Sequence, residues 1–420
     1  MNHDQRILRT TILCGLVVVV EGYDLSVLGY VVPQLVDTWG MPAAAFTVAL
    51  TAGNVGMFLG AVGCGWLGDR YGRKPVLLGC IGAFGVASLL TAITTDATQL
   101  AWARLATGIG LGGGIPTCIA LVSDVSPPHR QGTLVIAMIT GVVIGNLLAG
   151  IVSASMLEAF GWPSVFVVGG VVPILLLPII ALFLPESGKL LAIRAEAALS
   201  GQTLHRASAL LGPRFLGQTV LLWSINFLNL LTIYFVNSWL PSILRGMGAT
   251  TEGAILATSM FHVGAIVAAF VSGSLVGRFG IERVLTVMLV FGGACLFVTG
   301  VANLTVTILG FFVLGFGFGT NGSQLGISAL PGAIYPTEIR STGAGWATGI
   351  GRLGNISGAL LGGALLGLGW SSKEMLLALA TAPLVTSLLM WQLGRRRRAE
   401  HLSARGVAAV AGEGTRRSTV

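Results

Sequence analysis

The amino-acid sequence predicts an all-α integral membrane protein with about twelve transmembrane helices. Of its 420 residues, 54% are hydrophobic and only 10% are charged, whereas soluble proteins carry about 25% charged residues. The mean hydropathy is +0.86. The apolar runs are about 20 residues long, which is the length that a helix needs to cross a hydrocarbon core about 30 Å thick.

Charged residues and Pro/Gly-rich breaks divide the chain into the predicted spans. The runs fall near 10–33, 44–67, 76–95, 98–122, 132–156, 162–184, 217–240, 253–276, 284–302, 304–330, 342–367 and 372–394. The first run is too long for a secretion signal and carries two acids, so we expect it to be retained as the first helix.

The loops differ in their content of Lys and Arg. If the N-terminus is cytoplasmic, only Arg245 and Lys373 lie on the outer side, while Arg104 and Arg352 fall inside spans. The positive-inside rule therefore places both termini in the cytoplasm, and we expect a multi-pass protein of the bacterial inner membrane. The net charge of +8 follows from these loops and does not indicate nucleic-acid binding. The lipid bilayer is the expected surrounding, and a monomer is the default state.

The sequence repeats itself at about half its length. Gly65–Lys74 (GWLGDRYGRK) and Gly273–Arg283 (GSLVGRFGIER) are offset by 208 residues, and Arg130 and Arg340 by 210. Two independent pairs indicate duplication into two pseudo-symmetric six-helix halves. The expected divisions are a six-helix half over 1–185, a cytoplasmic linker over 186–215, a second six-helix half over 216–394 and a disordered basic tail over 395–420.

The first of these loops resembles the G-x-L-x-D-R-x-G-R-R/K signature of the major facilitator superfamily. The resemblance implies the major facilitator fold and a conformational latch, in which Asp69 faces the start of the eleventh span and Arg73 pairs with Asp124. In the second copy, Gly277 stands where Asp69 stands in the first. A solvated turn whose cations only fix the topology is the alternative. The residues assigned to gating are Asp69, Arg70, Gly72, Arg73, Asp124 and Arg340.

Longer stretches resemble the aromatic acid:proton symporter family. They are EGYD in the first span, RLATGIGLGGGIP in the fourth, LPES after the sixth, NSWLP in the seventh, and YPTEIRSTGAGWATGIGRLGNISG into the eleventh. Many members carry aspartate at the position of Glu21. The resemblance implies proton-coupled import of an aromatic carboxylic acid of the benzoate, hydroxybenzoate or phenylpropanoate type.

Two acids, Glu21 and Asp24, lie inside the first span, where each charge costs about 2.5–3.5 kcal/mol. Asp24 lies roughly 21 Å from the cytoplasmic face and Arg104 of the antiparallel fourth span roughly 9 Å below the outer face, so both lie at one depth. We expect an ion pair, with Asp24 as the principal proton-coupling acid and Glu21, on the same helix face, as its partner. A static pair that fixes helix packing is the alternative.

Arg352 falls near the bilayer midplane, where a guanidinium requires an anionic partner or water. Its planar fork suits a carboxylate, so it is the leading candidate for substrate binding; packing among carbonyls is the alternative. Tyr234 and Trp239 fit the interfacial belt or the core better than stacking on a substrate ring. Further polar residues inside spans could contact substrate or only bond another helix; they are His262, Asn226, Asn229, Asn54 and Asn146.

The sequence therefore favours a secondary transporter that moves a small organic anion with protons by alternating access. Another organic acid, such as a muconate-like dicarboxylate or nicotinate, a drug-type exporter and a membrane substrate sensor are the alternatives. The fifth span lacks the Gly-Pro pair of drug antiporters and carries Asn146 in place of the proline. The sequence shows no catalytic, cofactor or metal motif, so we expect no enzyme activity, no cofactor and no metal.

Overall fold

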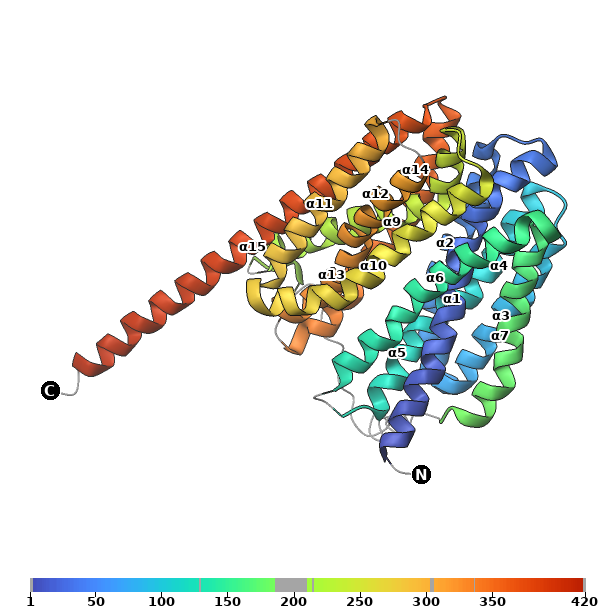
Figure 1. Cartoon of the computed structure of the whole chain (residues 1–420). Helices are drawn as coiled ribbons and strands as arrows, with labels where there is room; N and C mark the ends of the chain where they lie inside the picture. The colour runs from blue at the N-terminus through green and yellow to red at the C-terminus, as the bar shows by residue number, and fades with distance from the viewer. Residues whose placement is uncertain are drawn as a thin grey trace.

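The computed structural model describes residues 3–127, 130–185, 210–213, 215–302, 306–335 and 337–417, and its regular elements there are all helices (Figure 1). The helices of the first half are α1 (His3–Trp39), η1 (Ala43–Phe46), α2 (Thr47–Tyr71), α3 (Arg73–Ala92), α4 (Ala97–Gly112), α5 (Gly114–Val125), α6 (Gln131–Phe160) and α7 (Pro163–Phe183). Those of the second half are α9 (Leu216–Gly246), α10 (Thr251–Phe279), α11 (Ile281–Val301), α12 (Val306–Gly319), α13 (Asn321–Ile334), α14 (Thr337–Gly367) and α15 (Ser372–Arg417).

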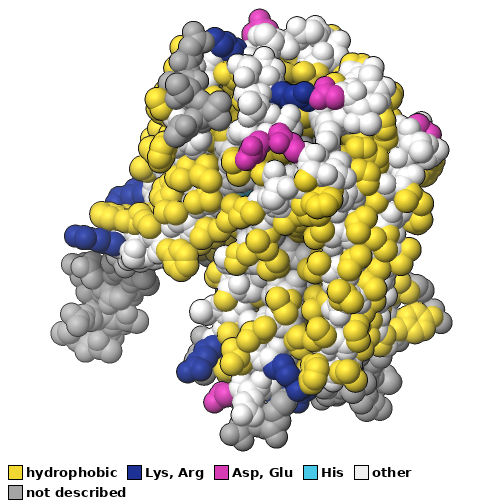
Figure 2. Space-filling model, turned by 45° about the vertical axis from the view of Figure 1, so that its right-hand side comes forward, with side chains coloured by type: hydrophobic (Ala, Val, Ile, Leu, Met, Phe, Trp, Pro, Cys, Tyr) yellow, Lys and Arg dark blue, Asp and Glu magenta, His cyan; other side chains and the backbone are white. Residues whose placement is uncertain are grey.

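Ten helical stretches among these residues are long and apolar enough to cross a membrane. The pair α12 and α13 and the more polar α14 bring the spans to twelve. On the face shown in Figure 2, hydrophobic side chains cover the middle and most charged side chains lie toward the ends. The predicted all-α membrane fold is therefore confirmed, and the chain is a multi-pass membrane protein.

The two halves pack their helices in the same pattern. In the first half α1 lies on α6, α2 on α4, and α3 on α7; in the second half α9 lies on α14, α10 on α12, and α11 on α15. In each half these are the first and fifth, the second and fourth, and the third and sixth spans. The shared pattern is what duplication of a six-helix unit produces.

Two spans that the sequence predicts as single helices are broken in the middle. The fourth divides into α4 and α5 at Gly113, and the tenth into α12 and α13 at Thr320. Pro116 lies in the first turn of α5, where its missing N–H leaves no bond unmade. Both breaks occur at equivalent positions of the two halves, so each half presents the start of a short helix near its centre.

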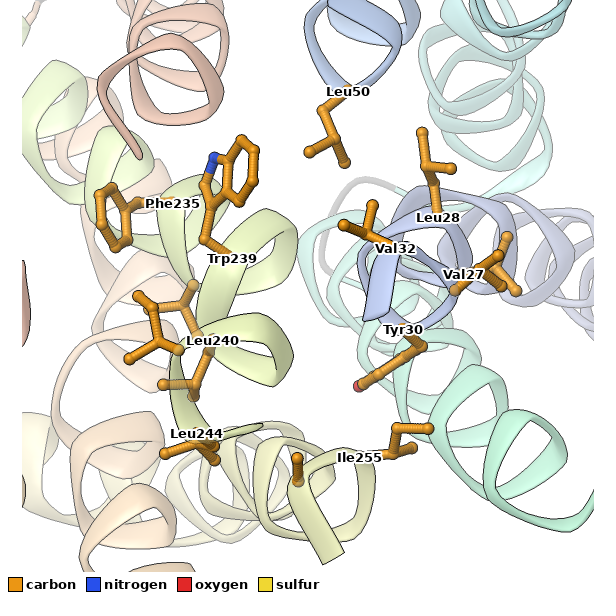
Figure 3. Packing of buried hydrophobic residues seen from close by; sticks show 14 of the residues in the cluster. Val27, Leu28, Tyr30, Val32, Leu50, Phe235, Trp239, Leu240, Leu244 and Ile255 are labelled. Atoms are coloured by element: carbon orange, nitrogen blue, oxygen red, sulfur yellow. The ribbon is translucent and has the colours of Figure 1, made fainter. Parts of the chain in front are cut away.

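The halves meet through α1 on α9, α6 on α10, and α2 on α14. At the α1–α9 crossing, a Cβ on Gly29 would lie 1.9 Å from the carbonyl oxygen of Asn237, so only glycine allows this approach. Val32 of α1 and Leu50 of α2 face Trp239 of α9, and Tyr30 points toward the second half (Figure 3). These side chains belong to one buried hydrophobic cluster that spans both halves.

An ion pair closes the interface where α1 and α9 end. Arg245 lies 2.5 Å from the carboxylate of Asp37 and donates a second hydrogen bond of 2.6 Å to the carbonyl oxygen of Pro33. Toward the end that carries the N-terminus the two halves diverge (Figure 1), and the molecule is hollowed between them there (Figure 2). The structure is therefore closed at one end of the interface and open at the other.

The ends of the second half bear on two further expectations. The linker expected over 186–215 lies outside the described residues except for 210–213 and 215. The segment from Arg395, which we expected to be disordered, continues α15 as far as Arg417. Alanine, arginine and glutamate are strong helix formers and are frequent in this segment, which gives a physical reason for the continuation.

Candidate functional site

The predicted ion pair between Asp24 and Arg104 is present at the centre of the first half. Arg104 Nη2 lies 2.6 Å from Asp24 Oδ2, and Nη1 lies 3.1 Å from Oδ1. The two side chains are 0% and 5% exposed, and the ring of Phe166 lies 5.8 Å from the guanidinium. This two-pronged contact ties α1 to α4 and satisfies both charges within the first half.

Glu21 lies one turn before Asp24 on α1 but has a different environment. Its carboxyl group faces the break in the fourth span, where it accepts a hydrogen bond from the backbone N–H of Ile115, in the first turn of α5. A Cβ on Gly114 would lie 1.5 Å from Glu21 Oε1, so the glycine makes the space that the carboxyl group fills. The residue is 2% exposed and its Oε2 has no hydrogen-bond partner.

Arg352 reaches this region from α14 of the other half. It is half-buried, and its Nη1 donates a long hydrogen bond of 3.4 Å to the carbonyl oxygen of Met57 on α2. It interacts electrostatically with both Glu21 and Tyr234. Among the described residues it forms no ion pair within 4 Å. The sequence thus predicted two separate sites that the structure brings together.

A small, partly open cavity of about 30 Å³ lies beside Arg104, between the halves. Arg104, Asn54, Tyr234 and Ser238 provide its polar lining. The volume suits about one water molecule. Tyr234, which the sequence placed in the belt or core, is therefore part of the site, and Asn54 lies at its edge while donating to the carbonyl oxygen of Leu50.

Asn226 and Asn229 belong to a polar network in the second half. Asn226 Nδ2 donates to the carbonyl oxygen of Ala347, and Gln324 Nε2 donates to Asn226 Oδ1. Asn229 Nδ2 donates to Gln324 Oε1 at 2.8 Å. Sequence reasoning missed Gln324, although its amide lies in the predicted tenth span, where other polar residues were treated as candidates. The network joins α9, α13 and α14.

The remaining polar candidates lie in helix contacts. His262 is fully buried, its Nδ1 lies 3.5 Å from Asn321 Nδ2, and its Nε2 has no hydrogen-bond partner. Asn146 accepts a hydrogen bond of 2.9 Å from Ser26, which joins α6 to α1. Their contribution to substrate binding stays a prediction.

The latch region is described in part. Arg73 pairs with Asp124, as expected, and also donates to the carbonyl oxygen of Ala120. Gly72 adopts a φ of 109°, a conformation that favours glycine, so it is required for the turn between α2 and α3. The side chains of Asp69, Arg70 and Arg340 lie outside the described residues.

Comparison with known proteins extends these observations. The sequence profile of the Major Facilitator Superfamily matches residues 14–326 and 222–413. The chain is 37% identical to the gallate transporter of Pseudomonas putida over 382 residues, 85% of each chain. It is 35% identical to the 4-hydroxybenzoate transporter PcaK of the same organism over 397 residues, 88% of this chain and 89% of the relative.

A solved structure shows the same fold. The partially occluded inward-open conformation of the xylose transporter XylE from E. coli superposes with a TM-score of 0.74 at 18% identity, covering 92% of this chain and 98% of that one. The profile match and the two relatives identify the family independently of this likeness. The chain is therefore a transporter that belongs to the major facilitator superfamily, and it is not an enzyme.

Proposed function

We propose that this protein imports an aromatic carboxylic acid together with a proton across the bacterial inner membrane. The similar proteins named for gallate and 4-hydroxybenzoate support the substrate class. Both substrates combine a benzoate carboxylate with ring hydroxyl groups. The observation that carries the proposal is the position of Arg352, a half-buried cation of the second half that reaches Met57 of the first half and lies within electrostatic range of Glu21.

Arg352 is the residue best placed to bind the substrate carboxylate. Arg104 is already occupied by Asp24 through two hydrogen bonds, whereas Arg352 holds only a carbonyl oxygen at 3.4 Å. A guanidinium binds a carboxylate through paired N–H donors, and such charge-assisted bonds are about twice as strong as neutral ones. An arriving substrate would therefore replace a weak contact of Arg352 with a strong one.

Competition for Arg352 gives a physical route to proton coupling. While the substrate site is empty, the positive charge of Arg352 favours the ionised form of Glu21 and opposes burial, which favours the neutral form. A bound substrate carboxylate would pair with Arg352. Glu21 would then lose the stabilising effect of that positive charge and bind a proton. Substrate and proton then bind together and stabilise each other's occupancy, as reciprocal linkage requires. This assigns the coupling proton to Glu21 and leaves Asp24 in a fixed pair with Arg104.

The closed end of the interface supports an inward-facing state. With both termini in the cytoplasm, Arg245 and Asp37 close the outer side and the hollow between the halves (Figure 2) opens inward. Rocking the halves about the α1–α9 contact would break this pair and expose Arg352 from outside. Loading would then take place at the outer side and release at the inner side.

Uptake into proteoliposomes tests the proposal. Purified protein is reconstituted and given radiolabelled 4-hydroxybenzoate, gallate, benzoate, nicotinate or muconate, with and without an inward proton gradient. We expect accumulation of hydroxylated benzoates that a protonophore abolishes. Equal uptake with and without the gradient would contradict proton coupling, and accumulation of only the non-aromatic acid would contradict the substrate class.

A further inference from the structure

The second copy of the loop motif differs from the first in its charged residues. It joins α10 to α11, and Gly277 replaces the acid that Asp69 provides in the first copy. Arg278 stands where Arg70 stands in the first copy, Glu282 replaces Lys74, and Arg283 is an additional cation; Arg278 and Arg283 are both exposed. The loop thus carries exposed arginines without the aspartate, and the transport cycle proposed above assigns it no role.

A basic pocket of about 400 Å³ lies at this loop. It is lined by Glu282 and Arg283 from the start of α11, by Ala333 from the end of α13, and by Arg397 and Arg398 from α15. Three arginines and one glutamate give it a net charge of +2. Arg397 pairs with Glu282 and donates a hydrogen bond to the carbonyl oxygen of Ala333, so its positive charge is partly neutralised.

Arg283 and Arg398 carry the excess charge of the pocket. Arg398 Nε donates a hydrogen bond of 3.1 Å to the carbonyl oxygen of Gly394, and its two terminal nitrogens form no hydrogen bond with the described residues. Arg283 forms no ion pair or hydrogen bond with any described residue. The first turn of α11 adds backbone N–H groups, because a helix leaves its first N–H groups without an intrahelical acceptor. The pocket is therefore suited to an anion.

An apolar groove of about 500 Å³ continues from the pocket along α10, α11 and α12. The pocket and the groove share two residues, Phe279 and Arg283. Val287 and Phe291 line the groove and are 69% and 48% exposed, so they lie on the outer surface of the bundle, where the acyl chains of the bilayer lie. The charged and apolar compartments are thus continuous and meet at Arg283.

We infer that an anionic phospholipid binds at this corner of the second half. Its phosphate lies between Arg283 and Arg398, and one acyl chain follows the groove past Val287 and Phe291. A free inorganic anion would use the pocket alone, and a zwitterionic lipid would leave the net charge unmatched. The size and continuity of both compartments favour a ligand with a negative head group and a hydrocarbon chain. The lipid would connect α11 to α15.

Native mass spectrometry of the full-length protein in detergent tests this inference. The protein is titrated with phosphatidylglycerol, phosphatidylcholine and glycerol 3-phosphate. We expect phosphatidylglycerol to bind at least tenfold more tightly than the other two. Each arginine near an anionic head group contributes about fivefold, so Arg283→Gln should weaken binding about fivefold and the double variant with Arg398→Gln about 25-fold.

Two matched variants separate the compartments. Arg395→Gln removes the same charge outside the pocket, where the guanidinium lies 4.8 Å from the ring of Trp391, and should change binding less than twofold. Val287→Trp fills the groove, so it should weaken the binding of phosphatidylglycerol severalfold without changing the binding of glycerol 3-phosphate. Equal binding of phosphatidylcholine, wild-type affinity in the double variant, or equal binding of glycerol 3-phosphate would each overturn the inference.

Discussion

Glu21 of α1 and Arg352 of α14 lie within electrostatic range of each other across the interface between the two halves, although 331 positions separate them in the sequence. Asp24, one turn from Glu21, is instead held by Arg104 within its own half. The two acids of the first span therefore have different partners. The partner of Asp24 lies within the first half, whereas the cation within electrostatic range of Glu21 belongs to the second half.

The space for the Glu21 carboxyl group depends on Gly114. A Cβ there would lie 1.5 Å from Oε1 and 2.6 Å from the carboxyl carbon, so Gly114→Ala must displace the acid from α5. We expect uptake of 4-hydroxybenzoate to fall at least tenfold. Gly15→Ala, on the same helix as Glu21 with nothing within 4 Å of the added Cβ, should leave uptake within twofold. Adding Glu21→Asp to Gly114→Ala should restore part of the rate because the side chain is shorter. Normal uptake in Gly114→Ala would contradict this packing.

Loss of Arg352 should weaken substrate binding more than it weakens folding. A hydrogen bond to a charged group contributes about 1.5–3 kcal/mol, so Arg352→Gln should raise the half-saturating 4-hydroxybenzoate concentration about 10- to 150-fold. Arg352→Lys keeps the charge but loses the planar fork. Its half-saturating concentration should therefore lie between those of the wild type and Arg352→Gln. Substrate counterflow measures the half-saturating concentration without a proton gradient. Arg130→Gln, at the exposed start of α6, is the control. An unchanged half-saturating concentration in Arg352→Gln would exclude the residue from carboxylate binding.

Breaking the buried Asp24–Arg104 pair should lower stability. Removing one partner of such a pair costs about 3–5 kcal/mol, whereas replacing both by apolar residues of similar volume is often neutral. Asp24→Asn should therefore aggregate at a lower temperature, and Asp24→Leu combined with Arg104→Met should recover most of the loss. Size-exclusion chromatography after heating measures both. If Asp24→Asn were as stable as the wild type, the pair would not hold α1 to α4.

The outer ion pair should bias the protein toward the inward-facing state. Arg245 and Asp37 are 33% and 57% exposed on their side chains, and exposed pairs contribute at most about 1 kcal/mol. In a cysteine-free background with Ser238→Cys, Asp37→Asn should increase labelling by an external impermeant maleimide up to about fivefold. The charge-reversed pair Asp37→Arg with Arg245→Asp should restore the low labelling. No change in Asp37→Asn would show that the pair does not close the outer side.

Sequence reasoning placed elements well because hydrophobic length and loop charge depend on the bilayer alone. It also predicted the Asp24–Arg104 contact, since depth along two antiparallel helices follows from counting residues. It did not predict that Glu21 approaches Arg352 or that Gln324 joins Asn226 to Asn229. Those contacts depend on how each helix is rotated.

The rotation of each helix about its own axis is hard to derive from this sequence because lipid-facing and buried surfaces are both apolar. The helix breaks at Gly113 and Thr320 were missed for a related reason. The apolar residues on the two sides of each break read as one run, and we therefore predicted one helix for each span. Each break nevertheless carries a local signal: GGGIP with Pro116 at the first, and the polar stretch TNGSQ, which starts at Thr320, at the second.

The most direct test of the proton-coupling mechanism is gradient-driven uptake by Glu21→Gln compared with substrate counterflow in the same liposomes. Glutamine resembles the protonated acid, so we expect counterflow of 4-hydroxybenzoate to persist while accumulation driven by the proton gradient is lost. Glu252→Gln, which removes an exposed carboxylate at the start of α10, should retain both. Wild-type accumulation by Glu21→Gln under the gradient would show that the coupling proton is carried elsewhere.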